Sequence, residues 1–170
     1  MGLALVGYLA FVAACTAVAI RLTLAGIRRG TLPELALGLG FLLSGCVGFL
    51  LMIAPMLAPG LDPQTLERVG IAGQAVSSAG FLGLYAFNTV VFAPGSRLAV
   101  VLSAAGCLLL AVGVVGGAGA GLESFFRVDS PWHWCTFAGR SGAFLWSAVA
   151  GLHQHALARR RQVLGLVDPV

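Results

Sequence analysis

Apolar residues fill five long stretches of this chain, and nearly all charged residues lie in the segments between them. The stretches are residues 3–24, 35–58, 69–92, 98–118 and 134–158. Each is long enough to cross the roughly 30 Å hydrocarbon core of a membrane as a helix, which takes about 20 residues. The pattern therefore predicts an all-α fold, an integral membrane helical bundle with five transmembrane helices.

Composition supports a membrane protein. Apolar residues make up 59% of the 170 residues and charged residues 9%, whereas about 25% of a soluble domain is charged. The length predicts a single transmembrane domain over residues 1–170. The chain has no lysine and is rich in Ala, Gly, Leu and Val, which is typical of a GC-rich bacterial genome. We therefore expect a bacterial inner membrane location.

The arginines predict an orientation, because they alternate between the two sides of the membrane. One side carries seven arginines and the opposite side carries two, Arg68 and Arg127. The seven are Arg21, Arg28, Arg29, Arg97, Arg159, Arg160 and Arg161. Basic residues concentrate in cytoplasmic loops. The N-terminus is therefore expected outside and the C-terminus in the cytoplasm. The net charge of +4 sits at membrane edges, so it does not indicate a nucleic-acid partner.

Helix-start signals mark the gaps. Thr31-Leu32-Pro33-Glu34 is typical of a capping box with proline in the first turn. Asp62-Pro63 and Ser130-Pro131 each place an N-cap acceptor directly before a proline. Ala93-Pro94-Gly95-Ser96 predicts a tight turn that makes its two helices antiparallel neighbours.

Small residues recur at helical spacing in the second and third stretches, where they would let helix backbones approach closely. The predicted packing seams are Gly40, Ser44 and Gly48, and Gly73, Ser77 and Gly80. A chromophore or lipid pocket is the alternative use of such seams.

Polar residues share one face of the third stretch. Gln74, Ser78, Tyr85 and Asn88 fall on this face together with Phe81. Polar groups are costly against lipid, so the stripe is expected to face other helices and form interhelical hydrogen bonds. The alternative is a polar cavity for a small ligand or quinone.

Arg140 is the one charged residue well inside a stretch, six residues after Trp134, or about 9 Å along a helix. Side chains lean toward the start of their helix, so Arg140 is expected to extend to the outer interface. Glu123 and Asp129 could meet it there, beside Trp132 in an aromatic-rich loop. These four residues form a candidate outer-face docking site, for which simple membrane anchoring is the alternative.

The sequence contains no full set of residues for catalysis, metal binding or haem ligation. All three histidines lie on the last stretch, and His153 and His155 are two residues apart and so point to nearly opposite faces of a helix. The four cysteines form no CxxC pair. We expect no enzyme activity and no obligatory cofactor, although the seams could hold a lipid and the polar stripe a quinone.

Two segments carry a resemblance. Residues 28–48 read RRGTLPELALGLGFLLSGCVG and residues 158–170 read ARRRQVLGLVDPV. Both are similar to segments of uncharacterised bacterial multi-pass membrane proteins with a Thr-x-Pro-Glu-Leu helix start. The resemblance implies a seven-helix relative, in a sensory role, of which this chain holds five spans. In that case Asp168-Pro169 would open a further hairpin; otherwise residues 165–170 are a natural tail.

Together these features predict a non-catalytic scaffold or accessory subunit that packs against other transmembrane proteins and membrane lipids. The alternative is a seven-helix-like sensor for a small apolar ligand or quinone. A transporter is disfavoured because broken helices and intramembrane carboxylates are missing from the pattern.

Overall fold

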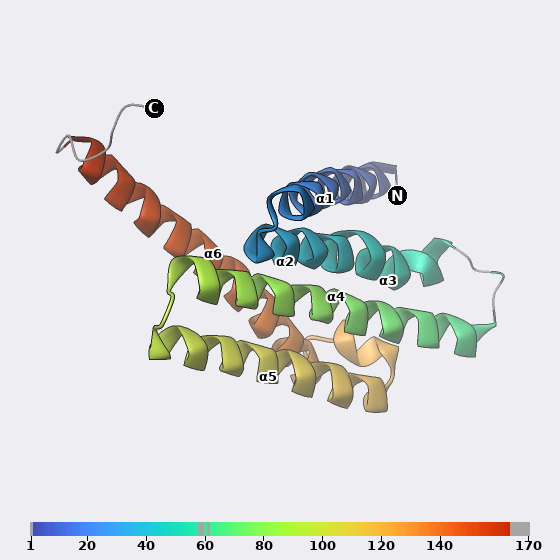
Figure 1. Cartoon of the computed structure of the whole chain (residues 1–170). Coiled ribbons are helices and arrows are strands. Elements are labelled where there is room, and N and C mark those ends of the chain that lie inside the picture. The colour runs from blue at the N-terminus through green and yellow to red at the C-terminus, as the bar shows by residue number, and fades with distance from the viewer. Residues whose placement is uncertain (1, 58–59, 61, 164–170) are drawn as a thin grey trace.

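The computed structural model describes residues 2–57, 60 and 62–163, and it folds them into helices with no strand among them (Figure 1). The helices are α1 (Gly2–Arg29), α2 (Leu32–Phe41), the π-helical turn η1 (Leu42–Val47), α3 (Gly48–Leu57), α4 (Pro63–Phe92), α5 (Arg97–Ala120), the 3₁₀ turn η2 (Leu122–Phe125) and α6 (Pro131–Val163). The elements α2, η1 and α3 follow one another without a break and form one long helix. The all-α prediction is confirmed for these residues.

Four of the helices are long and apolar enough to cross a membrane. They cover Val6–Arg29, Leu32–Pro55, Pro63–Phe92 and Arg97–Ala120, which match the first four predicted stretches. The fifth stretch forms most of α6, a helix of 33 residues that is not among these four. Ala58, at the end of the second stretch, and the tail motif Asp168-Pro169 lie outside the described residues.

Helices α4 and α5 begin at side-chain caps that lie before their apolar stretches. Asp62 accepts hydrogen bonds from the backbone N–H groups of Gln64 and Thr65, so α4 starts at Pro63, before the apolar stretch at residue 69. Ser96 caps α5 in the same way through the N–H of Ala99. The expected capping bonds of Thr31 and Ser130 do not form, although α2 and α6 begin directly after these residues.

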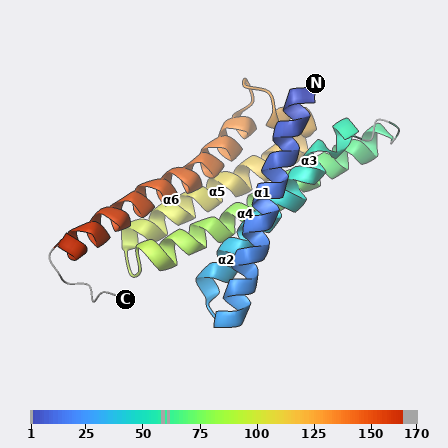
Figure 2. The ribbon, with the colours of Figure 1, turned by 90° about the horizontal axis from the view of Figure 1, so that it is seen from above.

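Helix α4 occupies the centre of the bundle. It packs against α2, η1 and α3 on one side and against α5 and α6 on the other. Helix α1 lies outermost, against α2 and η1 (Figure 2). The C-terminal part of α6 extends beyond its neighbours, and its residues from Leu152 to Arg161 are almost all exposed.

The π-helical turn η1 changes the alignment of the second long helix. The N–H of Gly48 donates to the carbonyl of Leu43, five residues earlier, so the turn takes up one residue more than an α-helical turn. In an ideal α-helix eight residues would set Gly48 about 80° away from Gly40 around the axis. Because one residue is absorbed, the offset falls to about 20°, and both glycines face α4.

Candidate functional site

The polar stripe predicted on α4 is buried in the bundle. Gln74 is 3% exposed, Ser78 5%, Tyr85 4% and Asn88 0%. Their polar atoms bond to α6. The stripe is therefore an interface between two helices, and its members divide into two groups along α4.

The first group joins α4 to α6 through side-chain hydrogen bonds. The Tyr85 hydroxyl donates to the carbonyl of Gly139 at 2.7 Å, and the Asn88 amide donates to the carbonyl of Ala143 at 3.3 Å. Ser147 in turn donates to the Asn88 side-chain oxygen at 3.0 Å. These bonds satisfy polar groups that would be costly in an apolar interior.

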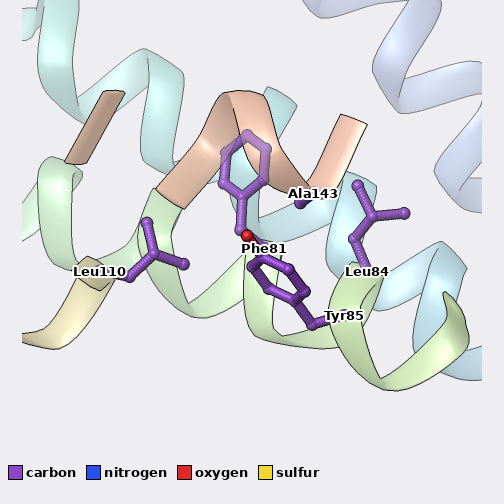
Figure 3. Packing of buried hydrophobic residues seen from close by; sticks show 5 residues of the cluster. All are labelled: Phe81, Leu84, Tyr85, Leu110 and Ala143. Carbon is purple, nitrogen blue, oxygen red and sulfur yellow. The ribbon is translucent and has the colours of Figure 1, made fainter. Parts of the chain in front are cut away.

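Apolar side chains pack around this group. Phe81, Leu84 and Tyr85 of α4 form the core cluster with Leu110 of α5 and Ala143 of α6 (Figure 3). Leu110 is 1% exposed and Ala143 0%, so the cluster marks where three helices meet. The polar stripe thus runs beside the buried apolar core.

The second group surrounds Arg140. Its Nη2 donates to the Gln74 side-chain oxygen at 2.6 Å, to the Ser78 hydroxyl at 3.1 Å and to the Gln74 carbonyl at 3.3 Å. The guanidinium carbon lies 5.8 Å from the centre of the Phe81 ring, within the range of a cation–π interaction. The Nε–H is buried without a hydrogen-bond partner.

This placement corrects the prediction for Arg140, which was expected to reach Glu123 or Asp129. The side chain lies on the face of α6 that meets α4, where a buried amide and a hydroxyl are within reach. Asp129 is engaged by Arg127 in a 2.6 Å ion pair. The lean of a side chain along its own helix was outweighed by partners on the neighbouring helix.

The remaining members of the candidate docking site lie around the connection between α5 and α6. The hydrogen bonds from Arg127 hold the pKa of Asp129 below its usual value. Glu123 is the second residue of the short turn η2, and the Trp132 ring lies against Gly116 of α5. The structure therefore separates Arg140 from Glu123, Asp129 and Trp132.

The two predicted seams of small residues meet each other. A Cβ atom on Gly80 would lie 2.5 Å from the carbonyl oxygen of Gly40 and from the backbone nitrogen of Ser44. A Cβ atom on Gly48 would lie 2.5 Å from the backbone nitrogen of Ser77. One on Gly73 would meet the backbone of α3 at Met52, at 2.6 Å. Here α2, η1 and α3 approach α4 backbone to backbone.

A small cavity and an apolar groove adjoin these faces. A cavity of about 10 Å³ lies between α2, η1, α4 and α6, which is about the room that one water needs. Its lining is Leu37, Gly40, Phe41, Ser44, Gly80, Phe81, Leu84 and Phe144. An apolar groove runs along α4 and α5 and includes Ser78, Leu82, Cys107 and Val114.

Sequence reasoning missed the matching polar face of α6. Thr136, Arg140 and Ser147 follow one another at intervals of four and seven residues, which places them on one helical face. Thr136 is 4% exposed, and the other two contact the stripe on α4. The periodicity that revealed the stripe on α4 would have revealed this second stripe.

Comparisons with known proteins give no relative: no family model, curated protein or solved structure matches the chain.

Proposed function

We propose that this protein is a non-catalytic membrane subunit, a scaffold or accessory component that packs against other transmembrane proteins. One observation carries the proposal. The polar side chains of the stripe on α4 are engaged in hydrogen bonds that hold α4 to α6, and so they are not left free to act on a substrate. The interior then serves helix packing, and the outer surface is left for contacts with other molecules.

The outer surface supports partners in the membrane. Large apolar side chains are exposed along the outward faces of α1, α5 and α6, such as Ile27 at 64%, Val115 at 74% and Leu152 at 71%. Lipid and apolar faces of other transmembrane helices are the surroundings that suit such surfaces. Nucleic acid is not expected as a partner.

The proposed topology has five spans, with α6 as the fifth. At about 1.5 Å per residue its 33 residues measure roughly 50 Å, which exceeds the hydrocarbon thickness of about 30 Å. The arginine pattern supports an outer N-terminus and a cytoplasmic C-terminus in a bacterial inner membrane. Reporter fusions after Gly30, Gly95 and Arg161 are expected to report cytoplasm, and a periplasmic signal at any of them would refute this topology.

The scaffold role is tested with the intact chain in native membranes. Mild detergent extraction followed by size separation is expected to yield the chain in a defined complex with other membrane proteins. Chemical crosslinking before extraction shows whether the complex exists in the membrane. A chain that crosslinks to nothing and purifies alone would contradict the proposal.

A sensor for an apolar ligand or quinone is the second candidate. The apolar groove along α4 and α5, with Ser78 and Cys107 in its lining, favours it. Under this proposal the purified protein carries a stoichiometric isoprenoid quinone that organic extraction releases. Replacement of Ala79, another groove residue, by tryptophan would fill the groove and lower the bound quinone.

A further inference from the structure

Arg140 has no acidic partner in the described part of the chain. The acidic residues there lie near helix ends or in connections: Glu34, Asp62, Glu67, Glu123 and Asp129. Glu67 lies seven residues before Gln74 on α4, or about 10 Å along the axis, and it accepts the N–H of Leu122. The hydrogen-bond partners of Arg140 are neutral.

The guanidinium of Arg140 is largely buried and has neutral partners, so its positive charge lacks a counter-charge in the described part of the chain. Arginine stays protonated in proteins, and charges away from water are normally paired with opposite charges. The three hydrogen bonds of Arg140 all leave from Nη2, and Nε–H has no partner. Nη1 makes none of these hydrogen bonds and is not among the buried atoms, so the guanidinium retains donors that a carboxylate can engage.

We propose that Arg140, with Gln74 and Ser78, binds the carboxylate of an Asp or Glu side chain on a transmembrane helix of a partner protein. This inference rests on the proposed scaffold function and names the chemistry of one contact. The Gln74 amide and the Ser78 hydroxyl keep the guanidinium in place until the acidic helix docks.

The surroundings of Arg140 suit a docked helix. Phe137 and Phe144 lie about one helical turn to either side of it on α6, and they are 53% and 50% exposed. Phe144 packs edge-on against Phe81 at a centroid distance of 5.2 Å. Arg140 therefore lies at the edge of the α4–α6 interface, between two apolar side chains that a partner helix can cover.

Depth in the membrane favours a protein carboxylate over a lipid phosphate. Arg140 is nine residues after Pro131, about 14 Å from the start of α6, and Gln74 is about 17 Å from the start of α4. The side chain points across to α4 rather than along α6 toward the headgroups. Lipid phosphates lie outside the hydrocarbon core, whereas a side chain on a spanning helix reaches this depth.

The test uses the purified full chain in neutral phosphatidylcholine vesicles at pH 8. Two synthetic polyleucine transmembrane peptides serve as probes, one with a single Glu and the other with Gln at the same position, about 14 Å from the matching end. Energy transfer between labelled chain and labelled peptide reports association. The wild-type chain is expected to bind the Glu peptide about tenfold more tightly than the Gln peptide, as for a charge-assisted bond between helices.

Variants assign the preference to Arg140. Arg140→Gln should bring the ratio of the two affinities close to one, and Arg140→Lys should keep part of it, because the charge stays and the fork is lost. Arg97→Gln removes an exposed arginine and should leave the ratio unchanged.

Equal binding of both peptides to the wild-type chain would overturn the proposal without requiring any variant to fold. A second result would also overturn the proposal and assign the site to a lipid phosphate. In that result, phosphatidylglycerol in place of part of the neutral lipid abolishes the preference for the Glu peptide, and this effect requires Arg140. If the native complex stays intact while the Glu preference is absent, this inference fails and the scaffold function stands. If the chain purifies alone, the scaffold function itself fails.

Discussion

Helix α4 holds its neighbours by two different means on its two sides. Toward α2, η1 and α3 it presents Gly73, Ser77 and Gly80, and the backbones touch. Toward α6 it presents the polar stripe, and side-chain hydrogen bonds span the gap. The first side depends on the absence of side-chain volume, and the second depends on matched donors and acceptors.

The difference shows how one helix can be held from both sides in lipid, where no hydrophobic effect drives helices together. Close backbone contact gains dispersion energy but tolerates no added atoms. Hydrogen bonds tolerate small shifts but not the loss of a partner. The two sides should therefore respond to opposite kinds of substitution.

The largest effect is expected on the glycine side. Gly80→Val places atoms 2.5 Å or less from the backbone of Gly40 and Ser44, and backbone cannot move aside as a flexible side chain can. We expect a loss of about 3 kcal/mol or more in the free energy of unfolding, measured by SDS titration. Gly151→Val, at a position with nothing within 4 Å, is the control, and equal losses in both variants would remove the distinction between the two sides.

On the polar side, Arg140→Leu separates insertion from packing. Removing the charge should lower the membrane insertion cost by about 2.5–3.5 kcal/mol. The loss of its partner leaves the buried oxygens of Gln74 and Ser78 unsatisfied, and we expect the folded bundle to lose about 1–3 kcal/mol. A glycosylation-based insertion assay and SDS titration measure the two quantities, with Arg97→Leu as the control. If the Arg140→Leu bundle is more stable than the wild type, the polar contacts of Arg140 do not stabilise the fold.

A smaller effect is expected from Tyr85→Phe, which removes only the hydrogen bond to Gly139. Interhelical hydrogen bonds in membranes average about 0.6 kcal/mol, so the SDS midpoint should fall slightly. Tyr8→Phe is the control, since Tyr8 is 43% exposed and packs against Phe49 by its ring. A loss as large as that of Gly80→Val would mean that the polar side is as sensitive as the glycine side.

The smallest effect lies outside both sides, at the start of α4. Hydrogen bonds from the Thr65 hydroxyl and from the Gln64 N–H lower the pKa of Asp62. The stabilisation is therefore present above the ordinary carboxyl pKa near 4 and is lost as pH falls through the lower pKa of the folded state. The protection of the first-turn amides of α4 against hydrogen exchange, relative to an unfolded chain at the same pH, should fall as pH falls through that range. Asp62→Asn should remove this pH dependence. A wild-type chain whose first-turn protection stays constant over this pH range would contradict the prediction.

The sequence was sufficient for the long helices and for the inward face of α4, but the inward polar face of α6 was missed. Apolar stretches and caps located the helices, and periodicity picked out the residues that the structure buries on α4. The pairing of the two seams was not predictable, because spacing shows which residues share a face but not which helix covers it.

Two features could not be predicted from the sequence, each for a physical reason. The direction of Arg140 depends on Gln74 and Ser78, which lie more than 60 residues away in the chain, so local preference could not decide it. The π-helical turn η1 has no sequence signature of its own. On a regular helix the four-residue spacing of Gly40, Ser44 and Gly48 would turn Gly48 about 80° away from Gly40, so the spacing alone does not show that both glycines face α4.

The turn η1 makes the chain sensitive to length, and in one direction only. A one-codon deletion within Leu42–Val47 would let the segment close into regular α-helix, with a gain of good local hydrogen bonds. Gly48 would then follow Gly40 by seven residues, about 20° around the axis, so α3 would keep the face that it presents to Ser77. If all residues stayed and the turn closed into regular α-helix, α3 would instead rotate by about 100° relative to α2, so the extra residue is compatible with the bundle only while the turn absorbs it.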